Sequence, residues 1–317
     1  MNKDKNYLIG YTYKFEEGKK ARNEGKLLTL RLETSLACNM KCRYCAWDSG
    51  KSLDDEIEYD DLKRCIDDGI QLGIKSVVII GGGEPTIYRH FRELVSYIND
   101  NGLIPVVITN GLTMKSDLAQ FLYESNASVL LKHDSLREEV QDYLSGMSGA
   151  YAKIQDGLKN LMAAGYTSNQ ESGLRLGLSF VVTKQNIDEI TSIWKFCREN
   201  NIYPNMELLN PIGRTKDNAD DLLPNQQDVK KLIEEVKEID ASFGIQPSNE
   251  PPCLQHLYSM YLNVQGYIQP CGAIRIKEFK YDDYSSLKEC YEDSYFSRIR
   301  TIEKHLDEKS ELTYFRV

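Results

Sequence analysis

Six short apolar runs alternate with amphipathic helical patterns along most of this chain. The runs are rich in Val, Ile and Leu, as expected for strands buried on both faces of a parallel sheet. Between them, apolar residues recur at intervals of three and four, which indicates helices with one buried face. The predicted strands are 27–32, 77–80, 106–108, 129–131, 174–182 and 206–209.

This order predicts an α/β fold with a parallel sheet and helices outside it. Right-handed crossovers would curl the sheet into a barrel-like wall, and eight βα units would close a full barrel. Six units favour an open, partial (β/α)6 barrel of the TIM type, with its active site at the carboxyl ends of the strands. We expect residues 1–245 to form this core, with 1–26 as an N-terminal extension.

Composition excludes several classes of partner. The chain has 317 residues and a net charge of −9, with no basic tract. It also lacks any apolar run of roughly 20 residues that could cross a membrane. We therefore expect neither nucleic acid nor a membrane as a partner. The N-terminus shows no apolar h-region of a secretory signal, so the eight cysteines are expected to be reduced thiols in the cytoplasm.

Three cysteines, Cys38, Cys42 and Cys45, follow the first predicted strand with C-x3-C-x2-C spacing. Thiolates this close in sequence can hold one metal centre. A structural zinc needs four protein ligands, and no fourth Cys or His lies nearby in the sequence. A [4Fe–4S] cluster normally takes four thiolates, so three would leave one iron open to an outside ligand. On spacing alone, a zinc knuckle or a redox loop remains an alternative.

A glycine-rich loop follows the second predicted strand. Gly82, Gly83 and Glu84 lie in the segment Gly-Gly-Gly-Glu-Pro-Thr. Glycines allow unusual φ angles and a close approach of the backbone to a ligand. At the carboxyl end of a strand, such a loop suits the polar head of a ligand, although alone it is also compatible with an ordinary βα turn.

Together, the cysteine triplet and the strand that runs into GGGEP resemble the signature of the radical S-adenosylmethionine (SAM) enzymes. The resemblance implies that the open iron chelates SAM, and that an electron from the cluster splits SAM into methionine and a 5′-deoxyadenosyl radical. It further implies that Gly82, Gly83 and Glu84 bind the methionine end of SAM, and that Tyr44 contacts the adenine. A reducing partner of the flavodoxin or ferredoxin type is also implied.

Alternation along the fifth predicted strand separates two faces. Gly177 and Ser179 are expected to face the lumen, where small and polar groups leave room for a ligand. By the same alternation, Lys132 and Glu207 are expected to point inward near their strand ends. The opposite face of the fifth strand should pack under the helices and carries Leu174, Leu176, Leu178 and Phe180.

A buried Lys or Glu needs a partner. For Lys132 and Glu207 that partner could be SAM or the substrate, but a mutual salt bridge or a solvated rim position is equally compatible. The resemblance supports SAM binding by polar residues on the fourth and fifth strands, including Lys132 and Ser179. Asn110, after the third strand, and Ser135, in the loop after the fourth, are further candidates for SAM contacts.

Cys253 and Cys271 form a C-x12-G-x4-C pattern. This resembles the start of the SPASM and twitch extensions of radical SAM enzymes, so residues 246–317 are interpreted as a twitch-like C-terminal domain. Tyr261–Leu262 and Tyr267–Ile268 should form its hairpin, with a turn at Gln265 and Gly266.

In twitch domains a later C-x2-C completes an auxiliary cluster, but here Thr313 and Arg316 stand at those places. An auxiliary Fe–S cluster is therefore not expected. Unusual ligands such as Cys290, a fold kept without a cluster, and a thiol that donates a hydrogen atom remain three alternatives. Cys65, Cys197 and Cys290 each fit the apolar stripe of a helix and are expected in the core.

We interpret the chain as an enzyme that abstracts a hydrogen atom from a sugar-like or other small natural-product substrate. Epimerisation would need a hydrogen donor such as Cys253 or Cys271, and lyase or dehydratase chemistry an acid–base group such as Glu207. Dehydrogenation usually needs the auxiliary cluster, so a twitch-type dehydrogenase is an alternative, as is a peptide-modifying enzyme. A non-catalytic Fe–S or zinc protein is a more remote one, because it would need no GGGEP loop.

Overall fold

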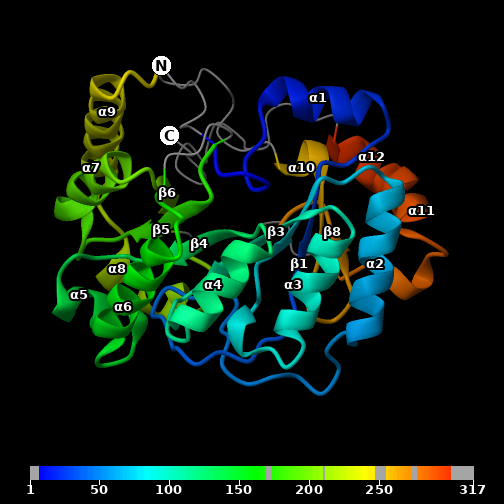
Figure 1. The fold of residues 1–317 in the computed structure, drawn as a ribbon, viewed down its shortest axis with the longest axis horizontal. Helices are drawn as coiled ribbons and strands as arrows, with labels where there is room; N and C mark the ends of the chain where they lie inside the picture. The colour runs from blue at the N-terminus through cyan, green and yellow to red at the C-terminus, as the bar shows by residue number, and fades with distance from the viewer. Residues whose placement is uncertain (1–6, 169–172, 210, 247–254, 273–276, 301–317) are drawn as a thin grey trace.

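The computed structural model describes residues 7–168, 173–209, 211–246, 255–272 and 277–300. Its centre is one sheet with the strand order β6-β5-β4-β3-β2-β1-β7-β8 (Figure 1). The strands from β6 through β7 pair in parallel, and β8 pairs antiparallel with β7. The strands are β1 (Thr29–Leu32), β2 (Ser76–Ile79), β3 (Ile104–Thr109), β4 (Ser128–Lys132), β5 (Leu176–Val182), β6 (Tyr203–Leu208), β7 (Ser259–Leu262) and β8 (Ile268–Gln269).

Helices follow each of the first six strands, which confirms the α/β fold with an open parallel sheet. The helices are α1 (Phe15–Asn23), α2 (Tyr59–Gln71), α3 (Phe91–Asp100), α4 (Ser116–Glu124), α5 (Glu138–Ser145), α6 (Ala150–Ala163), α7 (Ile190–Glu199), α8 (Ala219–Leu222), α9 (Gln226–Ser242), α10 (Gln255–Tyr258), α11 (Leu287–Glu292) and α12 (Ser294–Arg300). In the described part of the chain, no helix is both long and apolar enough to span a bilayer.

The main core lies between the sheet and the helices. Leu176, Leu178 and Phe180 belong to it, as the alternation predicted. The thiols of Cys65, Cys197 and Cys290 are also fully buried there, as expected for small apolar side chains.

A second, smaller apolar cluster fills the inner side of the sheet. It joins Leu8 and Tyr11, from the N-terminal segment, to inward-facing side chains of the strands. Leu174 belongs to this inner cluster, so its predicted place under the helices is wrong. The reason is that β5 begins only at Leu176, and Leu174 instead bridges to Leu8.

Gly177 does face inward, but it does not leave room for a ligand. A Cβ at this position would lie 2.6 Å from the Leu130 side chain and 3.4 Å from that of Leu8. The side chains of Leu130 and Leu8 therefore fill the inner space beside Gly177.

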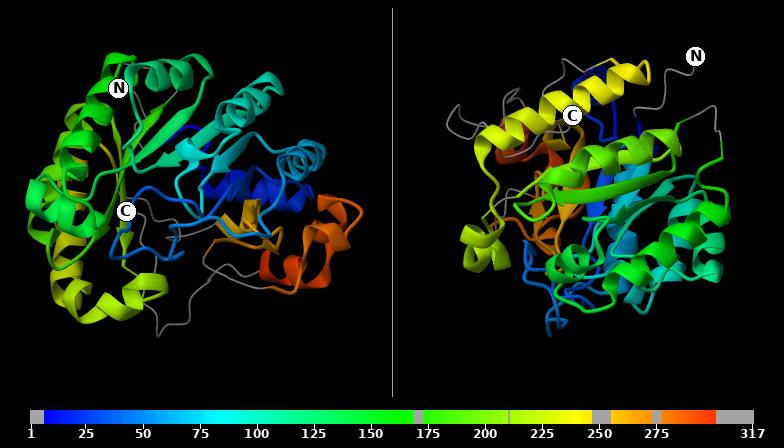
Figure 2. Two further views of the ribbon diagram at one scale, coloured as in Figure 1. Left: turned by 90° about the horizontal axis from the view of Figure 1, so that it is seen from below. Right: turned by 90° about the vertical axis from the view of Figure 1, so that its left-hand side faces the viewer.

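The C-terminal hairpin forms where the sequence placed it, with Gly266 at a φ of +81° in its turn. Its strand β7 pairs in parallel with β1, so the hairpin extends the barrel sheet. The expected domain boundary at 245/246 thus falls between strands of one sheet. Along the sheet, α11 and α12 lie at the opposite end of the molecule from α7 and α9 (Figures 1 and 2).

Candidate functional site

The three clustered cysteines lie partly buried in the loop after β1. Burial raises the pKa of Cys38, and it raises the pKa of Cys42 to about 12, with further contributions from the neighbouring thiols. The Cys45 sulfur lies 3.1 Å from Ser49 Oγ, and Asn110 Nδ2 lies 4.0 Å from the Cys38 sulfur. The three thiols therefore face one shared space.

This donor set fits a cluster better than a single ion. Among the described residues, no three His, Cys, Asp or Glu side chains converge on a point that would hold one metal ion. A [4Fe–4S] cluster engages each thiolate through a separate iron, so its ligands do not need to converge in that way. Cys38, Cys42 and Cys45 are the residues that would hold it.

The glycine-rich loop packs directly on the segment that carries the cysteines. The backbone N–H of Gly83 donates to Ser35 O at 2.8 Å, and that of Glu84 donates to Ala37 O at 2.9 Å. A Cβ at Gly83 would lie 1.9 Å from the Ala37 carbonyl oxygen, and one at Gly82 would lie 2.6 Å from the Leu36 side chain. Glycine is required at Gly83 because two backbones meet there.

The Glu84 side chain is fully engaged by the protein. Its carboxylate accepts hydrogen bonds from the Thr86 hydroxyl at 2.6 Å, the Thr109 hydroxyl at 2.6 Å and the Asn110 backbone N–H at 2.7 Å. Burial raises the pKa of Glu84, and these hydrogen bonds oppose that shift. The carboxylate ties the end of β2 to the end of β3, which leaves only the backbone of this loop for a ligand.

Asn110 lies beside the cysteine loop. Its Nδ2 donates to Asn39 Oδ1 at 2.7 Å, and its Oδ1 accepts from the Leu112 backbone N–H at 3.0 Å. With the contact to the Cys38 sulfur, the side chain acts as a spacer between β3 and the cysteines.

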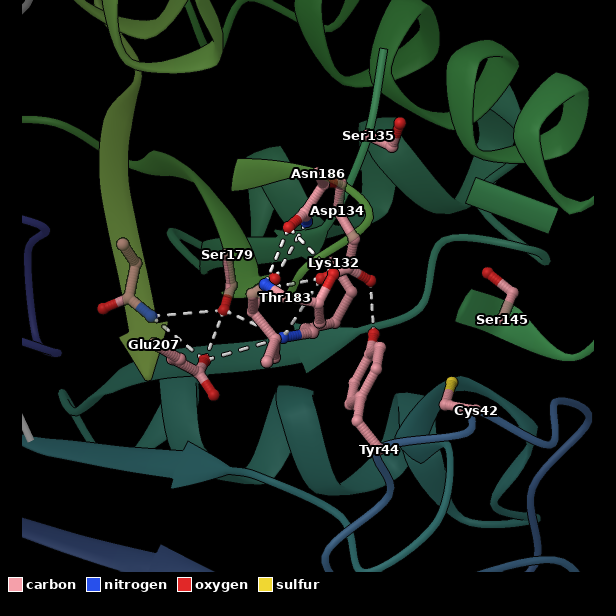
Figure 3. A network of polar contacts seen from close by, with 12 residues as sticks. Cys42, Tyr44, Lys132, Asp134, Ser135, Ser145, Ser179, Thr183, Asn186 and Glu207 are labelled. Carbon is pink, nitrogen blue, oxygen red and sulfur yellow. Dashed lines mark hydrogen bonds and ion pairs between the residues drawn. The ribbon is translucent and has the colours of Figure 1, made fainter. Parts of the chain in front are cut away.

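A polar network crosses the carboxyl ends of β4, β5 and β6 (Figure 3). Lys132 Nζ lies 3.3 Å from Ser179 Oγ and 3.7 Å from Glu207 Oε1. The same Glu207 oxygen accepts from Ser179 and, at 3.1 Å, from Asn205 Nδ2. Lys132 and Glu207 thus face each other as an ion pair, which is the mutual salt bridge that the sequence left open as an alternative.

The carboxylates of this network keep the Lys132 ammonium charged. Burial alone would lower the pKa of Lys132, but Glu207 and Asp134 raise it above its usual value, so the ammonium stays charged. The Glu207 side chain is 46% exposed, whereas that of Lys132 is 20% exposed. Glu207 therefore sits at the mouth of the lumen, with one oxygen fixed by the protein.

Tyr44 is fixed by Asp134, a residue that sequence reasoning did not single out as a site. The Tyr44 hydroxyl donates to Asp134 Oδ2, and Asp134 Oδ1 accepts from the Val181 backbone N–H at 2.8 Å. Burial, followed by the Asp134 charge, raises the pKa of Tyr44 well above its usual value. The signal for Asp134 is its place two residues after the end of the buried strand β4.

Ser135 does not join the polar network around Lys132 and Glu207. It is fully buried, its hydroxyl donates to Glu189, and its oxygen accepts from the Arg137 backbone N–H at 3.0 Å. Figure 3 shows it apart from the network around Lys132 and Glu207. Its neighbour Asp134 takes the inward position instead, because adjacent residues of an extended segment point in opposite directions.

The candidate hydrogen donors lie elsewhere. Cys271 is buried just after β8, near Tyr295 of α12. It therefore lies at the opposite edge of the sheet from Glu207. Cys253, Thr313 and Arg316 lie outside the described residues.

Sequence reasoning also missed a short segment after β6, η3 (Gly213–Asn218), that covers the cysteine loop. Arg214 Nε donates to Cys42 O at 2.9 Å, its backbone N–H donates to Cys45 O at 2.9 Å, and its Nη1 donates to Ser49 O at 2.8 Å. Thr215 Oγ1 donates to Tyr44 O at 3.0 Å. These bonds fix the backbone of the cysteine loop.

A second missed residue, Glu33, joins the cysteine loop to the C-terminal hairpin. Its carboxylate accepts from Trp47 Nε1, from the Tyr261 hydroxyl at 2.5 Å and from the Val264 backbone N–H at 2.9 Å. The partners come from distant parts of the chain, so no local pattern could reveal this role.

Known proteins share this architecture. The chain is 32% identical over 167 residues to Fe-coproporphyrin III synthase of Methanosarcina barkeri, covering 52% of this chain and 39% of that protein. It is 30% identical over 208 residues to the mycofactocin maturase MftC of Mycolicibacterium smegmatis, covering 65% and 51%. The chain thus spans about half the length, or less, of these curated relatives.

Among solved structures, Streptococcus suis SuiB bound to S-adenosylmethionine superposes with a TM-score of 0.70 at 20% identity, covering 87% of this chain and 68% of SuiB. The structure of anSMEcpe with bound AdoMet and a peptide gives a TM-score of 0.68 at 15% identity, covering 89% and 84%. Both likenesses show the fold.

The family model described as the Radical SAM superfamily matches residues 32–197, from the end of β1 through α7. That span contains the three cysteines, the glycine-rich loop and Lys132, and it covers more than half of the chain. Enzymes of this family use SAM and a [4Fe–4S] cluster. The chain belongs to the radical SAM superfamily.

Proposed function

We propose that this enzyme abstracts a hydrogen atom from an unactivated C–H bond of a sugar-like or other small substrate and completes a lyase or dehydratase reaction. The observation that carries the proposal is Glu207, a half-exposed carboxylate at the carboxyl end of β6. Such a group at the mouth of the lumen can take up or release a proton as the substrate radical rearranges.

The cluster and SAM, when bound, would supply the 5′-deoxyadenosyl radical. Cys38, Cys42 and Cys45 hold the cluster. The backbone of the glycine-rich loop binds the methionine end of SAM, since the Glu84 carboxylate is already engaged. Tyr44, held by Asp134, lies beside the adenine. A flavodoxin or ferredoxin supplies the electron.

Glu207 is positioned for acid–base work by its neighbours. Ser179, Asn205 and Lys132 all engage Oε1. No hydrogen bond or ion pair to Oε2 occurs among the described residues, which leaves that oxygen available to a substrate hydroxyl or amine. The three contacts fix the carboxylate, and a fixed base transfers a proton more effectively than a mobile one.

Other reactions have weaker support. For epimerisation, Cys271 would have to donate a hydrogen atom, but it is buried at the far edge of the sheet. Dehydrogenation would need an electron acceptor such as the auxiliary cluster that we do not expect. Peptide modification is the second candidate, because the relative MftC is a maturase and shares 30% identity over 208 residues.

The radical step is tested by anaerobic reconstitution with iron, sulfide, SAM and dithionite. The protein should form 5′-deoxyadenosine, measured by liquid chromatography with mass spectrometry. The variant with Cys38, Cys42 and Cys45 all changed to Ala should form none. Continued SAM cleavage by that variant would contradict the assignment of the cluster ligands.

The role of Glu207 needs a separate test. A pool of sugars and related small metabolites and a pool of short peptides are each screened for stimulated SAM cleavage and for new products. Glu207→Gln should keep uncoupled SAM cleavage but lower product formation by about 10²–10⁴-fold. The exposed Glu238→Gln on α9 is the matched control. Normal turnover by Glu207→Gln would refute the lyase proposal, and a response to peptides alone would favour the second candidate.

A further inference from the structure

Arg31 is a cation in the middle of β1 whose side chain faces inward. Its neighbours along the strand, Leu30 and Leu32, pack in the outer core between sheet and helices, so Arg31 points to the other face. Across the sheet it pairs with Val78, which belongs to the inner apolar cluster, and with Tyr261 of β7.

Among the residues that the structure describes, none forms a hydrogen bond or an ion pair with the guanidinium of Arg31. The residue is only 3% exposed, and its Nε and Nη2 are buried without a hydrogen bond. Its contact within the described residues is with the Tyr11 ring, whose centroid lies 5.1 Å from the guanidinium carbon. The acid two positions along the strand, Glu33, is instead bound by Trp47, Tyr261 and Val264.

A buried charge without a partner is costly, because the free energy of hydration is lost and nothing replaces it. Another buried arginine of this chain, Arg198, does have a charged partner, since its Nε lies 2.7 Å from Asp240 Oδ1. An aromatic ring offsets only part of the cost for Arg31. The position is therefore best explained by an anion that reaches the lumen only with a ligand.

We propose that Arg31 binds a carboxylate of the substrate, so that the enzyme acts on a molecule carrying a carboxylate group. This inference rests on the proposed function, since it assumes that the substrate occupies the lumen. A planar guanidinium matches a carboxylate through two parallel N–H···O bonds. A phosphate dianion would call for a second cation, and Lys132, which also faces inward, is already paired with Glu207.

The two anchoring residues come from separate parts of the sheet. Arg31 lies on β1, and Glu207 is the penultimate residue of β6, with four strands between β6 and β1 in the order β6-β5-β4-β3-β2-β1. A substrate held by both would lie across the lumen, with its carboxylate toward β1 and its reacting carbon toward β6. Removing Arg31 should then raise KM for the substrate more than it lowers the rate of SAM cleavage.

The first experiment measures the thermal stability of the reconstituted full chain without substrate. Arg31→Met keeps an unbranched apolar stem but removes the guanidinium and its unpaired charge. Its Tm should exceed that of the wild type by about 2–6 °C, because an unsatisfied buried group is removed. Arg31→Lys keeps the charge and should show no such gain. A lower Tm for Arg31→Met would overturn the proposal, since the guanidinium would then be stabilising the fold.

The second experiment uses acetate as the probe. Acetate replaces chloride at constant ionic strength, and inorganic phosphate is tested in a parallel series. Acetate should raise the Tm of the wild type more than that of Arg31→Met. An equal rise in Tm of both proteins would overturn the assignment of Arg31 as an anion-binding residue. If phosphate but not acetate raises the Tm of the wild type, the proposal that Arg31 binds a carboxylate is overturned.

Uncoupled SAM cleavage separates this inference from the proposed function. Arg31→Met should form 5′-deoxyadenosine at the wild-type rate when no substrate is present. If that rate falls more than tenfold, Arg31 serves the cofactor, and the substrate assignment fails. If the wild type itself cleaves no SAM, the proposed function fails, whereas the acetate experiment still decides the anion site.

Discussion

At the scale of single residues, close backbone contacts decide which positions tolerate no change. Gly83 lies where the glycine-rich loop meets the cysteine segment, and any Cβ there would overlap the Ala37 carbonyl. Gly50 also lies against this segment, at a bridge to Ala37, yet a Cβ there would meet nothing within 4 Å. The two glycines therefore form a matched pair for mutation.

We predict that Gly83→Val weakens SAM binding at least about tenfold, a change of about 1.4 kcal/mol or more in binding free energy. The displaced loop can no longer offer its backbone to the ligand, whereas the cysteines remain. Equilibrium dialysis measures the affinity, and visible absorbance reports the cluster. Gly50→Ala should bind SAM normally. Equal affinities in both variants would mean that the loop is only a turn.

The sequence predicts residues whose chemistry depends on local spacing, such as Cys38, Cys42 and Cys45. It did not reveal those whose role depends on a distant partner. Asp134 was overlooked because only the fold brings it to Tyr44. Ser135 was favoured as a SAM contact because it follows a strand, but position after a strand does not determine which side a residue faces.

At the scale of elements, the segment η3 and the C-terminal hairpin brace the cysteine loop from two directions. Arg214 binds the carbonyls of Cys42 and Ser49, and Tyr261 of β7 reaches the loop through Glu33 and Trp47. Neither brace could be predicted from the sequence, because both consist of contacts between segments far apart in the chain.

We predict that Arg214→Ala makes the cluster more labile. The loop loses three side-chain contacts, namely the hydrogen bonds to the Cys42 and Ser49 carbonyls and the ion pair with Asp48 at 2.9 Å. Bleaching of the visible absorbance in the presence of a chelator should be several-fold faster than in the wild type. Lys216→Ala, an exposed change in the same segment, is the control. Unchanged bleaching in Arg214→Ala would show that the loop holds its shape without η3.

Tyr261→Phe should lower the free energy of unfolding by about 1–3 kcal/mol, because a buried hydrogen bond to a carboxylate is lost. Urea denaturation under anaerobic conditions gives the value. Tyr267→Phe, in the same hairpin, removes a hydroxyl with no hydrogen bond to the described residues and should change stability little. Equal stabilities of the two variants would contradict the role assigned to Glu33.

At the scale of the whole molecule, the alternation of strands and helices was enough to predict the open parallel sheet. The strand ends differ by one or two residues in most cases, because side-chain pattern does not mark where pairing stops. The place of the hairpin beside β1 was not predictable, since its apolar residues suit any sheet edge. The Leu174 error has a similar origin, because alternation continues past the start of β5.

Counting the irons in the reconstituted protein tests whether the chain holds an auxiliary Fe–S cluster in addition to the first one. With no C-x2-C in the sequence, we expect about four irons per chain after reconstitution, one [4Fe–4S] cluster. About eight irons per chain would indicate a second cluster and would make dehydrogenation the favoured reaction. Deuterium from D₂O in the product, lost in Cys271→Ala, would instead favour a thiol donor and epimerisation.

The pairing of β1 with β7 has a consequence for biosynthesis. The cysteines leave the ribosome early, but one edge of β1 and the carboxylate of Glu33 find their partners only when β7 and Val264 have been made. Contacts between such distant segments form late and slow the search for the native state. Iron–sulfur loading in the cell should therefore follow translation rather than accompany it, and a nascent chain stalled before β7 should fail to retain its metal.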